Sequence, residues 1–487
     1  MKEKSKSGVN DMMRKILKIS GIVILVYMLY IFLTAIVIFM KDYDSLDENV
    51  IHNIDVSEYY SEDIGPDRVA IIEEGEDALA ARLNFVENAE EIVKIANFKI
   101  SSGEVTDAYF GLLLEVASQG VQVQFLTDGI AHNLHGPTND LYWAIVKSPN
   151  IEIRFFEPFS PLKPWTLNNR MHDKLFIVDN NMAITSGRNI GDDTFLKEAD
   201  GVFGYDRDVL IYSNSSDSEE SVLPELNTYF DELWNSEYTE VARDSSWSYF
   251  ENTANDEINR LETALADARQ DEDFPFNQEF DWENLSYPTN SVKLIKNPVT
   301  RMKKDPVVLL NLYHLMRNAD EKILAQAPYL IYNSELERVA DLGEVEADLH
   351  FLTNSKTSSP NFPAVAGFLN TQNNITRVAE QVYGFQGDGL LHGKSFVIDD
   401  RISLIGSFNY DSRSAFLSTE NMVVIDSEPF TEALTNNILD LMEDSRIYNE
   451  EGDYLPLSVD TPDTNPWYRE FILLIFRVFL YPFDNLL

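Results

Sequence analysis

The chain contains the same short pattern of residues twice. Met171 to Asn189 reads MHDKLFIVDNNMAITSGRN, and Leu391 to Asn409 reads LHGKSFVIDDRISLIGSFN. In both copies a histidine, a lysine, an aspartate and an asparagine stand at the same spacing, with apolar residues between the lysine and the aspartate. Such a run, rich in β-branched and aromatic residues, is typical of a buried strand. The repetition predicts two lobes with one plan, each organised around its own copy of this strand.

Each copy places its histidine and lysine two residues apart, so that both side chains face the same side of a strand. A single such pair would be typical of a solvated strand edge. Two copies packed about a pseudo-two-fold axis would bring two imidazoles, two ammonium groups and two carboxamides around one point. Cations and amide donors suit the non-bridging oxygens of a phosphodiester, and the two histidines can divide nucleophilic and acid work. This chemistry requires no metal and no other cofactor.

At these residues the sequence resembles the phospholipase D superfamily, whose defining mark is the doubled HxKxxxxD motif. The resemblance extends roughly from Ile71 to Leu455. Within the superfamily, NNRMHDKLFIVDNNMAITSGRNIGDDTF and LHGKSFVIDDRISLIGSFNYDSRSAFLSTENMVVI are most similar to bacterial cardiolipin synthases, as are Asn354-Ser355, Pro328-Tyr329 and residues 482–487. One departure is the segment IANF at residues 95–98, where relatives usually carry a Tyr-Tyr pair. It concerns the lining of the substrate cleft and not the catalytic set.

The resemblance implies a role for each motif residue. His172 is expected to attack a phospholipid phosphorus and form a phosphohistidine, while His392 protonates the departing alcohol and later deprotonates the incoming one. The two motif aspartates are expected to secure the motif strands. The residues expected to be catalytic are His172, Lys174, Asp179, His392, Lys394 and Asp399. Those expected to bind the phosphoryl oxygens are Lys174, Asn189, Lys394 and Asn409.

Three further acids are candidates for orienting the histidines. Asp206 and Asp208 lead into the apolar run Val209 to Ile211, and Glu420 precedes Val423 to Ile425 in the same manner. A carboxylate at the second imidazole nitrogen would fix the tautomer and stabilise the positive charge formed on protonation. Acids that simply face water remain the alternative for Asp206 and Asp208.

The overall charge narrows the class of substrate. The chain has 81 acidic and 38 basic residues, a formal net charge of -43, and no cysteine. The negative electrostatic field of such a chain would repel a polyanion such as nucleic acid, so a nuclease function is disfavoured. The absence of cysteine excludes disulfides, cysteine-ligated metal and a thiol nucleophile. An acidic protein would also be repelled by an anionic membrane, and therefore needs another means of staying near lipid.

The N-terminal region supplies that means. No charged residue occurs from Ile19 to Met40, a stretch that spans roughly 33 Å as a helix and is long enough to cross a bilayer. Six basic residues precede this stretch, and between Met40 and Tyr60 only Lys41 is basic. The positive-inside rule therefore predicts a single-pass protein of the cell membrane with a cytoplasmic N-terminus and extracytoplasmic lobes. A buried core helix is the alternative.

The predicted fold class is α/β, with two pseudo-symmetric phospholipase D-like lobes behind this transmembrane helix. Alternating strand and helix patterns in both halves indicate a mixed sheet covered by helices in each lobe. The expected segments are a basic cytoplasmic segment (1–18), the transmembrane helix (19–40), an acidic stem (41–68), lobe 1 (69–236), an acidic surface connector (237–290), lobe 2 (291–455) and a C-terminal tail (456–487).

Two features outside the motifs remain open. The tail from Pro466 to Leu480 is rich in aromatic and aliphatic residues but short for a membrane span, so it is either an interfacial helix or a covering helix on lobe 2. His132 and His135 share a loop, where a solvated loop is favoured over a metal site because no third ligand stands at usable spacing.

Three functions remain in competition. The resemblance favours a transferase that joins two phosphatidylglycerol-type membrane phospholipids into cardiolipin. A phospholipase D-type hydrolase, with water as the acceptor, is the second. The third is a non-catalytic, membrane-tethered lipid-binding protein, which the two intact motifs disfavour. The sequence does not specify the oligomeric state.

Overall fold

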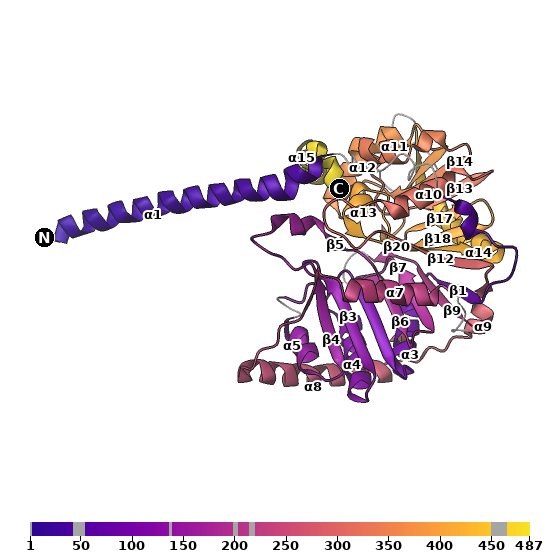
Figure 1. Cartoon of the computed structure of the whole chain (residues 1–487), viewed down its shortest axis with the longest axis horizontal. Helices are drawn as coiled ribbons and strands as arrows, with labels where there is room; N and C mark the ends of the chain where they lie inside the picture. Colours follow the sequence, from indigo (N-terminus) through magenta and orange to yellow (C-terminus); the bar gives the residue numbers. More distant parts are fainter. Residues whose placement is uncertain (1, 42–53, 136–138, 198–202, 214–219, 450–464) are drawn as a thin grey trace.

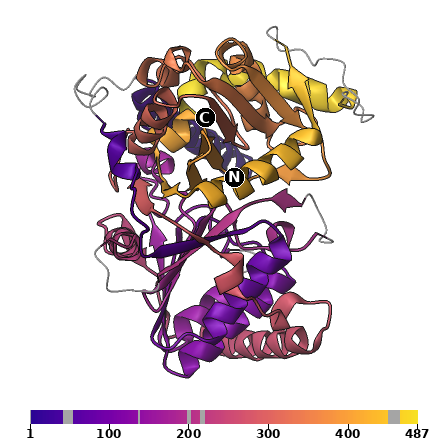
Figure 2. The same ribbon diagram turned by 90° about the vertical axis from the view of Figure 1, so that its right-hand side faces the viewer.

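Two α/β lobes of matching topology form the body of the protein, and a long N-terminal helix extends from it. The structure is a computed structural model that describes residues 2–41, 54–135, 139–197, 203–213, 220–449 and 465–487. Figure 1 shows α1 (Lys2–Ile31) projecting from one side of the body, and Figure 2 shows lobe 1 and lobe 2 stacked on each other. The predicted fold class is confirmed.

Lobe 1 is built on a nine-stranded mixed sheet with strand order β10-β4-β3-β2-β6-β7-β9-β1-β11. Strands β2, β3 and β4 run parallel to one another, and the remaining pairs are antiparallel. Its strands are β1 (Asp67–Ile72), β2 (Ile92–Asn97), β3 (Gln122–Asp128), β4 (Ile151–Phe156), β6 (Leu175–Val178), β7 (Met182–Ser186), β9 (Asp208–Ser213), β10 (Thr239–Val241) and β11 (Tyr287–Pro288). Its helices are α3 (Gly75–Glu87), α4 (Glu104–Ser118), α5 (Asn139–Lys147), η5 (Pro164–Asn168), α6 (Asp192–Phe195), α7 (Leu223–Trp234), α8 (Ser248–Gln270), η6 (Pro275–Asn277) and α9 (Trp282–Leu285).

Lobe 2 repeats this order on an eight-stranded sheet, β21-β15-β14-β13-β17-β18-β20-β12, in which β13, β14 and β15 are the parallel strands. Its strands are β12 (Ser291–Lys296), β13 (Lys322–Gln326), β14 (Asp348–Asn354), β15 (Gln381–Phe385), β17 (Ser395–Ile398), β18 (Ile402–Gly406), β20 (Asn421–Asp426) and β21 (Ser445–Tyr448). Its helices are α10 (Val307–Arg317), α11 (Ser334–Val339), η7 (Leu342–Glu344), α12 (Phe362–Ile375), α13 (Ser412–Phe416) and α14 (Glu428–Glu443). The internal duplication therefore extends through the whole order of the sheet.

The two motif strands, β6 and β17, are buried along their full length, as their continuous apolar character predicts. Each is paired on both sides within its own sheet, β6 with β2 and β7, and β17 with β13 and β18. One hydrophobic cluster takes side chains from both lobes, including Leu175 and Ile177 from β6 and Val397 from β17. The lobes thus share a core, which fixes the relative position of the two motifs.

Two short ladders also join the lobes. Strand β5 (Arg170–Met171) of lobe 1 pairs with β19 (Ser418–Thr419) of lobe 2, and β16 (Leu390–Leu391) of lobe 2 pairs with β8 (Gly204–Tyr205) of lobe 1. Each ladder aligns the residue before a motif histidine with the residue before an acid of the other lobe. This arrangement determines the geometry of the site.

The predicted connector and stem are more closely packed than their acidic composition indicates. Helix α8 packs on α4 and α5 of lobe 1 and buries Leu261 and Leu265. Part of the predicted stem, residues 42–53, lies outside the described residues. Beyond it, η3 (Val56–Tyr59) packs on lobe 2, where the Tyr59 hydroxyl donates to Asn311 Oδ1 at 2.7 Å.

The N-terminal helix continues into the body. After α1 the chain passes through η1 (Phe32–Ile36) and η2 (Val37–Met40), where Ala35 and Phe39 are buried. The segment Met12–Met40 is long and apolar enough to cross a membrane, and it is the single such helix among the described residues. At the other end of the chain, α15 (Trp467–Leu480) packs on α12 of lobe 2, and η8 (Tyr481–Leu486) contacts η2.

Candidate active site

The histidines of the two motifs line one cavity of about 620 Å³ between the lobes. His172 follows β5 and His392 follows β16, so the two inter-lobe ladders deliver both imidazoles to the same place. The backbone N–H of His172 donates to the carbonyl of Thr419 at 3.1 Å, and that of His392 donates to the carbonyl of Tyr205 at 2.7 Å. Each histidine is therefore held by the backbone of the opposite lobe.

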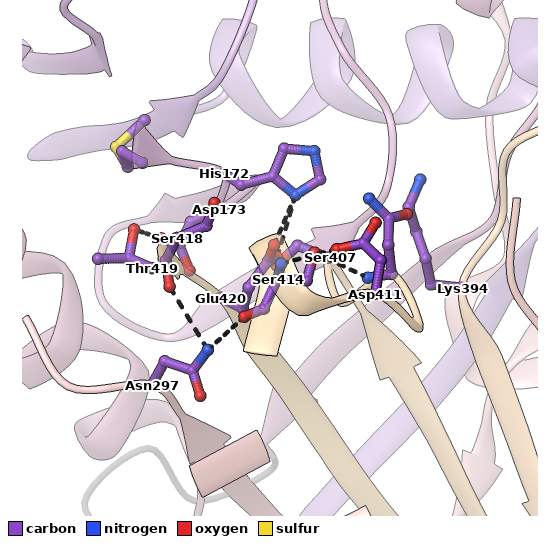
Figure 3. Close-up of polar contacts among 12 residues, drawn as sticks. His172, Asp173, Asn297, Lys394, Ser407, Asp411, Ser414, Ser418, Thr419 and Glu420 are labelled. Atoms are coloured by element: carbon purple, nitrogen blue, oxygen red, sulfur yellow. Dashed lines mark hydrogen bonds and ion pairs between the residues drawn. The ribbon is translucent and has the colours of Figure 1, made fainter. Parts of the chain in front are cut away.

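Each imidazole is also paired with a carboxylate of the opposite lobe. His172 Nδ1 lies 2.9 Å from Glu420 Oε1, and His392 Nδ1 lies 2.6 Å from Asp206 Oδ2. Both carboxylates are fully buried. Figure 3 shows His172 above Glu420, with Ser407 and Ser414 beside them. In each pair Nδ1 is engaged, so Nε2 is the nitrogen available to a substrate, although Nε2 of His392 also lies 3.2 Å from Lys394 Nζ.

The third predicted orienting acid, Asp208, lies elsewhere, and the structure does not bring it to a histidine. Its carboxylate accepts hydrogen bonds from Arg82 of α3 and from Arg188 Nε, the latter at 3.3 Å. Asp208 belongs to β9 and is completely buried, so it needs these two guanidinium groups as partners and is not available to a histidine.

The motif lysines lie beside their histidines. Lys174 Nζ donates to the carbonyl of His172, and Lys394 Nζ lies 3.0 Å from Nδ1 of His392. Burial, followed by the charge of Lys394, lowers the pKa of Lys174 to about 7. Burial lowers the pKa of Lys394 to about 8. The charge of Lys394 acts on Lys174, so the two lysines form one region of positive charge beside the histidines, which suits an anion.

The same environment keeps the imidazoles neutral. Burial, together with Lys174 and Lys394, lowers the pKa of His172 well below its ordinary value. Burial and Lys394 lower the pKa of His392 to about 4. A neutral imidazole has a free lone pair on one ring nitrogen, as a nucleophile requires.

The two carboxylates differ in ionisation. Burial raises the pKa of Glu420 to about 7, against the opposing charge of Lys174. Burial alone would also raise the pKa of Asp206, but His392 and Lys394 together hold it below its ordinary value. The two half-sites are thus built from equivalent residues but are electrostatically unequal.

Asn189 and Asn409 face the same cavity as the histidines. In the described part of the chain, their side-chain oxygens are buried and have no hydrogen-bond partner. A buried polar group that the protein leaves unpaired is costly unless a ligand or water satisfies it. Each of these oxygens is an acceptor, so it is placed to receive a hydrogen bond from a donor in the cavity, such as a hydroxyl group or water.

The motif aspartates contact neither histidine. Asp179 accepts hydrogen bonds from the backbone N–H groups of Glu90, Glu91 and Ile92 at 2.8 to 2.9 Å. Asp399 accepts from those of Asp320, Glu321 and Lys322 at 2.8 to 3.1 Å. Each aspartate fastens the turn after its motif strand to the start of the neighbouring strand. These contacts fit the expectation that the two aspartates secure the motif strands and act on the site only through them.

Other cavity residues were not singled out from the sequence. Lys99 and Arg413 add positive charge to the lining, and Asp411, whose pKa burial raises to about 6, caps α13 by accepting from Ser414 N–H at 2.7 Å. The N-cap pattern of Asp411 was readable in the sequence. The position of Lys99, which depends on the turn after β2, was not.

Aromatic rings also frame the histidines. The ring of Phe98 stands edge-on to His172 at 5.0 Å, and Tyr329 stands edge-on to His392 at 6.5 Å. Lys174 Nζ lies 5.1 Å from the centre of the Phe98 ring. Phe98 thus occupies the wall of the cleft at the IANF segment where the sequence departs from its relatives.

The histidines outside the motifs form no metal site in the described residues, where no group of three or more potential ligands of the usual types is gathered. The rings of His132 and His135 pack against each other at 4.6 Å, and His132 Nδ1 accepts from the backbone N–H of Leu134 at 2.9 Å. These contacts make His132 part of the local loop structure.

Comparison with known proteins agrees with this duplicated architecture. A family profile described as "Cardiolipin synthase, PLD-like domain" matches residues 83–234 and 312–442, more than half of the chain. An uncharacterized protein of Helicobacter pylori is 25% identical over 411 residues, covering 77% of this chain and 79% of that protein. Cardiolipin synthase C of Escherichia coli is 26% identical over 418 residues, covering 77% and 84%.

Among solved structures, the phosphatidylserine synthase of Haemophilus influenzae superimposes with a TM-score of 0.58. The match covers 86% of this chain and 95% of that protein at 16% sequence identity. At this identity the likeness shows the shared two-lobed fold alone.

Proposed function

The chain belongs to the cardiolipin synthase-type family of phospholipase D-like proteins, and from this premise we propose that it is a membrane-anchored phosphatidyltransferase that makes cardiolipin from two phosphatidylglycerol-type lipids. The observation that carries the proposal is the pair of histidine–carboxylate contacts that cross between the lobes into one cavity. Asn189 and Asn409 line the same cavity, and a lysine lies beside each of the two histidines.

The first half of the reaction forms a phosphohistidine. Nε2 of His172 attacks the phosphorus of the donor lipid, and the bond from phosphorus to the glycerol headgroup oxygen breaks. The proton that this oxygen needs comes from Nε2 of His392. The negative charge of the bound phosphodiester raises the pKa of His392 and thereby favours the protonated form that an acid requires.

The second half reverses these roles. His392, now neutral, removes the proton from a hydroxyl of the acceptor lipid, whose oxygen attacks the phosphohistidine and releases His172. Lys174 and Lys394 stabilise the charge on the non-bridging oxygens in both steps, and Asn189 and Asn409 donate amide hydrogen bonds. Glu420 and Asp206 fix the tautomers and stabilise each imidazolium as it forms.

The anchor places this chemistry at a membrane. We infer that α1 crosses the bilayer with its N-terminus in the cytoplasm and that both lobes lie outside. The excess of basic residues before Ile19 supports this orientation. The cluster of cations in the cavity would attract an anionic headgroup locally although the whole chain is acidic.

The test uses a host that lacks cardiolipin. Expression of the chain should produce cardiolipin in the membrane lipids, as measured by mass spectrometry, and His172→Asn should not. A host that stays free of cardiolipin with the folded, membrane-inserted chain present would contradict the proposal.

Hydrolysis is the second candidate function, since water can replace the acceptor alcohol. Incubation of the purified chain with headgroup-labelled phosphatidylglycerol in vesicles separates the two, because transfer yields cardiolipin and free glycerol, whereas hydrolysis yields phosphatidate and free glycerol. A non-catalytic lipid-binding protein would yield neither product.

A further inference from the structure

The membrane helix is fastened to lobe 1 partway along its apolar stretch. The hydroxyl of Tyr27 donates to the carbonyl of Pro161 at 2.9 Å, and the hydroxyl of Tyr30 donates to the carbonyl of Leu162 at 2.8 Å. In hydrocarbon, an unpaired backbone carbonyl is costly, whereas in water it needs no protein partner. Tyr27 and Tyr30 lie in the uncharged part of the helix and satisfy the carbonyls of this loop. Such pairing is expected of a loop that water does not reach.

The loop from Pro158 to Lys163 presents apolar side chains at this level. Phe159 is 54% exposed and Leu162 is 79% exposed. Tyr27 and Tyr30 lie in the uncharged stretch before the residues that are buried in the body. A bilayer that covers this stretch as far as Tyr30 therefore reaches the level of the loop.

Helix α15 turns its polar side to the protein and its apolar side outward, which is the reverse of a surface helix in a soluble protein. Its arginines turn to the protein, where Arg469 donates to the carbonyl of Ser359 and Arg477 Nε donates to Asn370 Oδ1 at 3.1 Å. Its apolar residues turn outward, and Leu473 is its one buried side chain. The exposed stripe consists of Trp467, Phe471, Leu474, Ile475 and Val478, which recur at helical spacing.

We propose that the loop and α15 form a membrane-insertion surface, comprising Phe159, Leu162, Trp467, Phe471, Leu474 and Val478, that enters the bilayer leaflet beside the end of α1. Figure 1 shows α15 and the end of α1 together on the side of the body from which the N-terminal helix projects. The occupant is lipid, because the surface is continuous with the membrane helix and the side chains that face it are apolar. The body of the protein thus contacts the leaflet directly and is not held above it by the stem.

This surface adjoins the catalytic cavity. Helix α15 packs on α12, and the cavity is lined by four residues at or just before the start of α12, namely Pro360, Asn361, Pro363 and Ala364. Leu487, which follows η8, lines it as well. If the proposed function holds, a phospholipid could present its headgroup to the histidines while its acyl chains remain in the leaflet.

Depth-sensitive fluorescence tests the insertion surface. Because the chain has no cysteine, single substitutions can be labelled with an environment-sensitive fluorophore in the full-length protein. The probes are Leu162→Cys, Phe471→Cys and Val478→Cys. The matched control is Leu285→Cys, an exposed leucine of α9 on the opposite side of the body (Figure 1).

In vesicles of phosphatidylcholine and phosphatidylglycerol, the three probes should emit at shorter wavelength than the control and should be quenched by lipid-borne quenchers. A probe at 162 or 471 that is as exposed to water-soluble quencher as the one at 285 would overturn the proposal. This readout is independent of catalysis, so a failure of the proposed function would leave it intact.

A second experiment measures how membrane insertion affects enzymatic turnover. Leu162→Asp combined with Phe471→Asp should lower activity on bilayers roughly tenfold, because a charge opposes insertion, but should leave activity on micellar short-chain lipid unchanged. Leu285→Asp should affect neither substrate. Equal loss of activity on micelles and bilayers would contradict a membrane-seating role.

Discussion

Glu420 and Asp206 hold equivalent places in the two half-sites but have different neighbours. The hydroxyl of Ser407 donates to Glu420, whereas the corresponding position in lobe 1 is Gly187. A Cβ at Gly187 would lie 2.4 Å from Asp206 Oδ1 and 2.9 Å from Lys394 Nζ. Glycine is therefore needed there so that Asp206 and Lys394 can both reach His392, and this local inequality offers a physical basis for different roles of the two histidines.

The histidines should be individually indispensable. His172→Asn and His392→Asn should each reduce turnover by several orders of magnitude, because groups that act as a unit are not additive. Both variants should keep the circular dichroism spectrum and thermal midpoint of the parent. Labelled lipid should leave phosphate on His172 alone in a rapid quench, and retention of more than about a tenth of activity in either variant would refute the division of labour.

The carboxylates should matter through their histidines. Glu420→Gln and Asp206→Asn preserve shape but remove the charge that stabilises each imidazolium, so kcat should fall roughly 10²- to 10⁴-fold with a smaller change in KM. Asp208→Asn, whose partners are Arg82 and Arg188, provides the contrast. It should lower the thermal midpoint while the folded fraction retains turnover.

The pH dependence should reflect the buried lysines and Glu420. A lysine with a lowered pKa loses its charge as pH rises through that value, about 7 for Lys174 and about 8 for Lys394. Glu420, whose pKa is raised to about 7, gains its charge over the same range. The kcat/KM profile should therefore be bell-shaped with a maximum near neutrality.

The corresponding profile of kcat provides the control. Because the bound phosphodiester is anionic, it should raise the pKa of both lysines and move the alkaline limb of kcat upward relative to that of kcat/KM. A kcat/KM that stays constant from pH 6 to pH 9 would be incompatible with these ionisations.

At the scale of single elements, the β-turn after each motif strand is the matched feature of the two lobes. Asp179 and Asp399 both adopt positive φ, 49° and 50°, and each receives three backbone N–H donors. The turns therefore bind β6 to β2 and β17 to β13 at the strand ends remote from the histidines. Their role is to hold the strand that carries each lysine in register.

Removal of one turn anchor should weaken the fold more than the chemistry. Asp179→Ala or Asp399→Ala leaves three backbone donors without their carboxylate, a loss of about 1 to 3 kcal/mol. The thermal midpoint in detergent should fall by roughly 2 to 6 °C, while the activity of the folded fraction falls much less than in the histidine variants. An unchanged midpoint with lost activity would instead favour a direct catalytic role.

At the scale of the whole molecule, the long N-terminal helix, both lobes and the C-terminal helix form one assembly. Helix α1 contacts lobe 1 through Tyr27 and Tyr30, and the buried Ala35 accepts from Asn168 Nδ2 at 2.7 Å through its carbonyl. Phe39 joins the core of lobe 2. If α1 spans a membrane as proposed, its orientation therefore determines on which side the candidate active site lies.

Sidedness can be measured directly. Protease added to intact protoplasts should digest the two lobes and spare a tag placed before Lys2, since the basic residues before Ile19 favour the cytoplasm. The same tag should become accessible after lysis. Complete protection of the lobes until lysis would reverse the predicted topology.

The sequence alone was sufficient for the family, the two-lobed fold and the histidines and asparagines of the cavity. The spacing of His172, Lys174 and Asn189 was repeated by His392, Lys394 and Asn409, and a buried strand requires the continuous apolar run that stands between lysine and aspartate. These features are local, so they can be read from neighbouring residues. The same pattern also indicated the anchoring function of Asp179 and Asp399, although not the atoms to which they bind.

Only the tertiary structure decided which acid serves which histidine. Asp206 and Asp208 both precede the same apolar run in the sequence, yet Asp206 contacts His392 and Asp208 contacts two arginines. The difference arises because β8 pairs with β16 of the other lobe, which carries Asp206 across the interface. Pairing between residues far apart in the chain depends on how the two sheets pack, and that packing leaves no signal in the spacing of either motif.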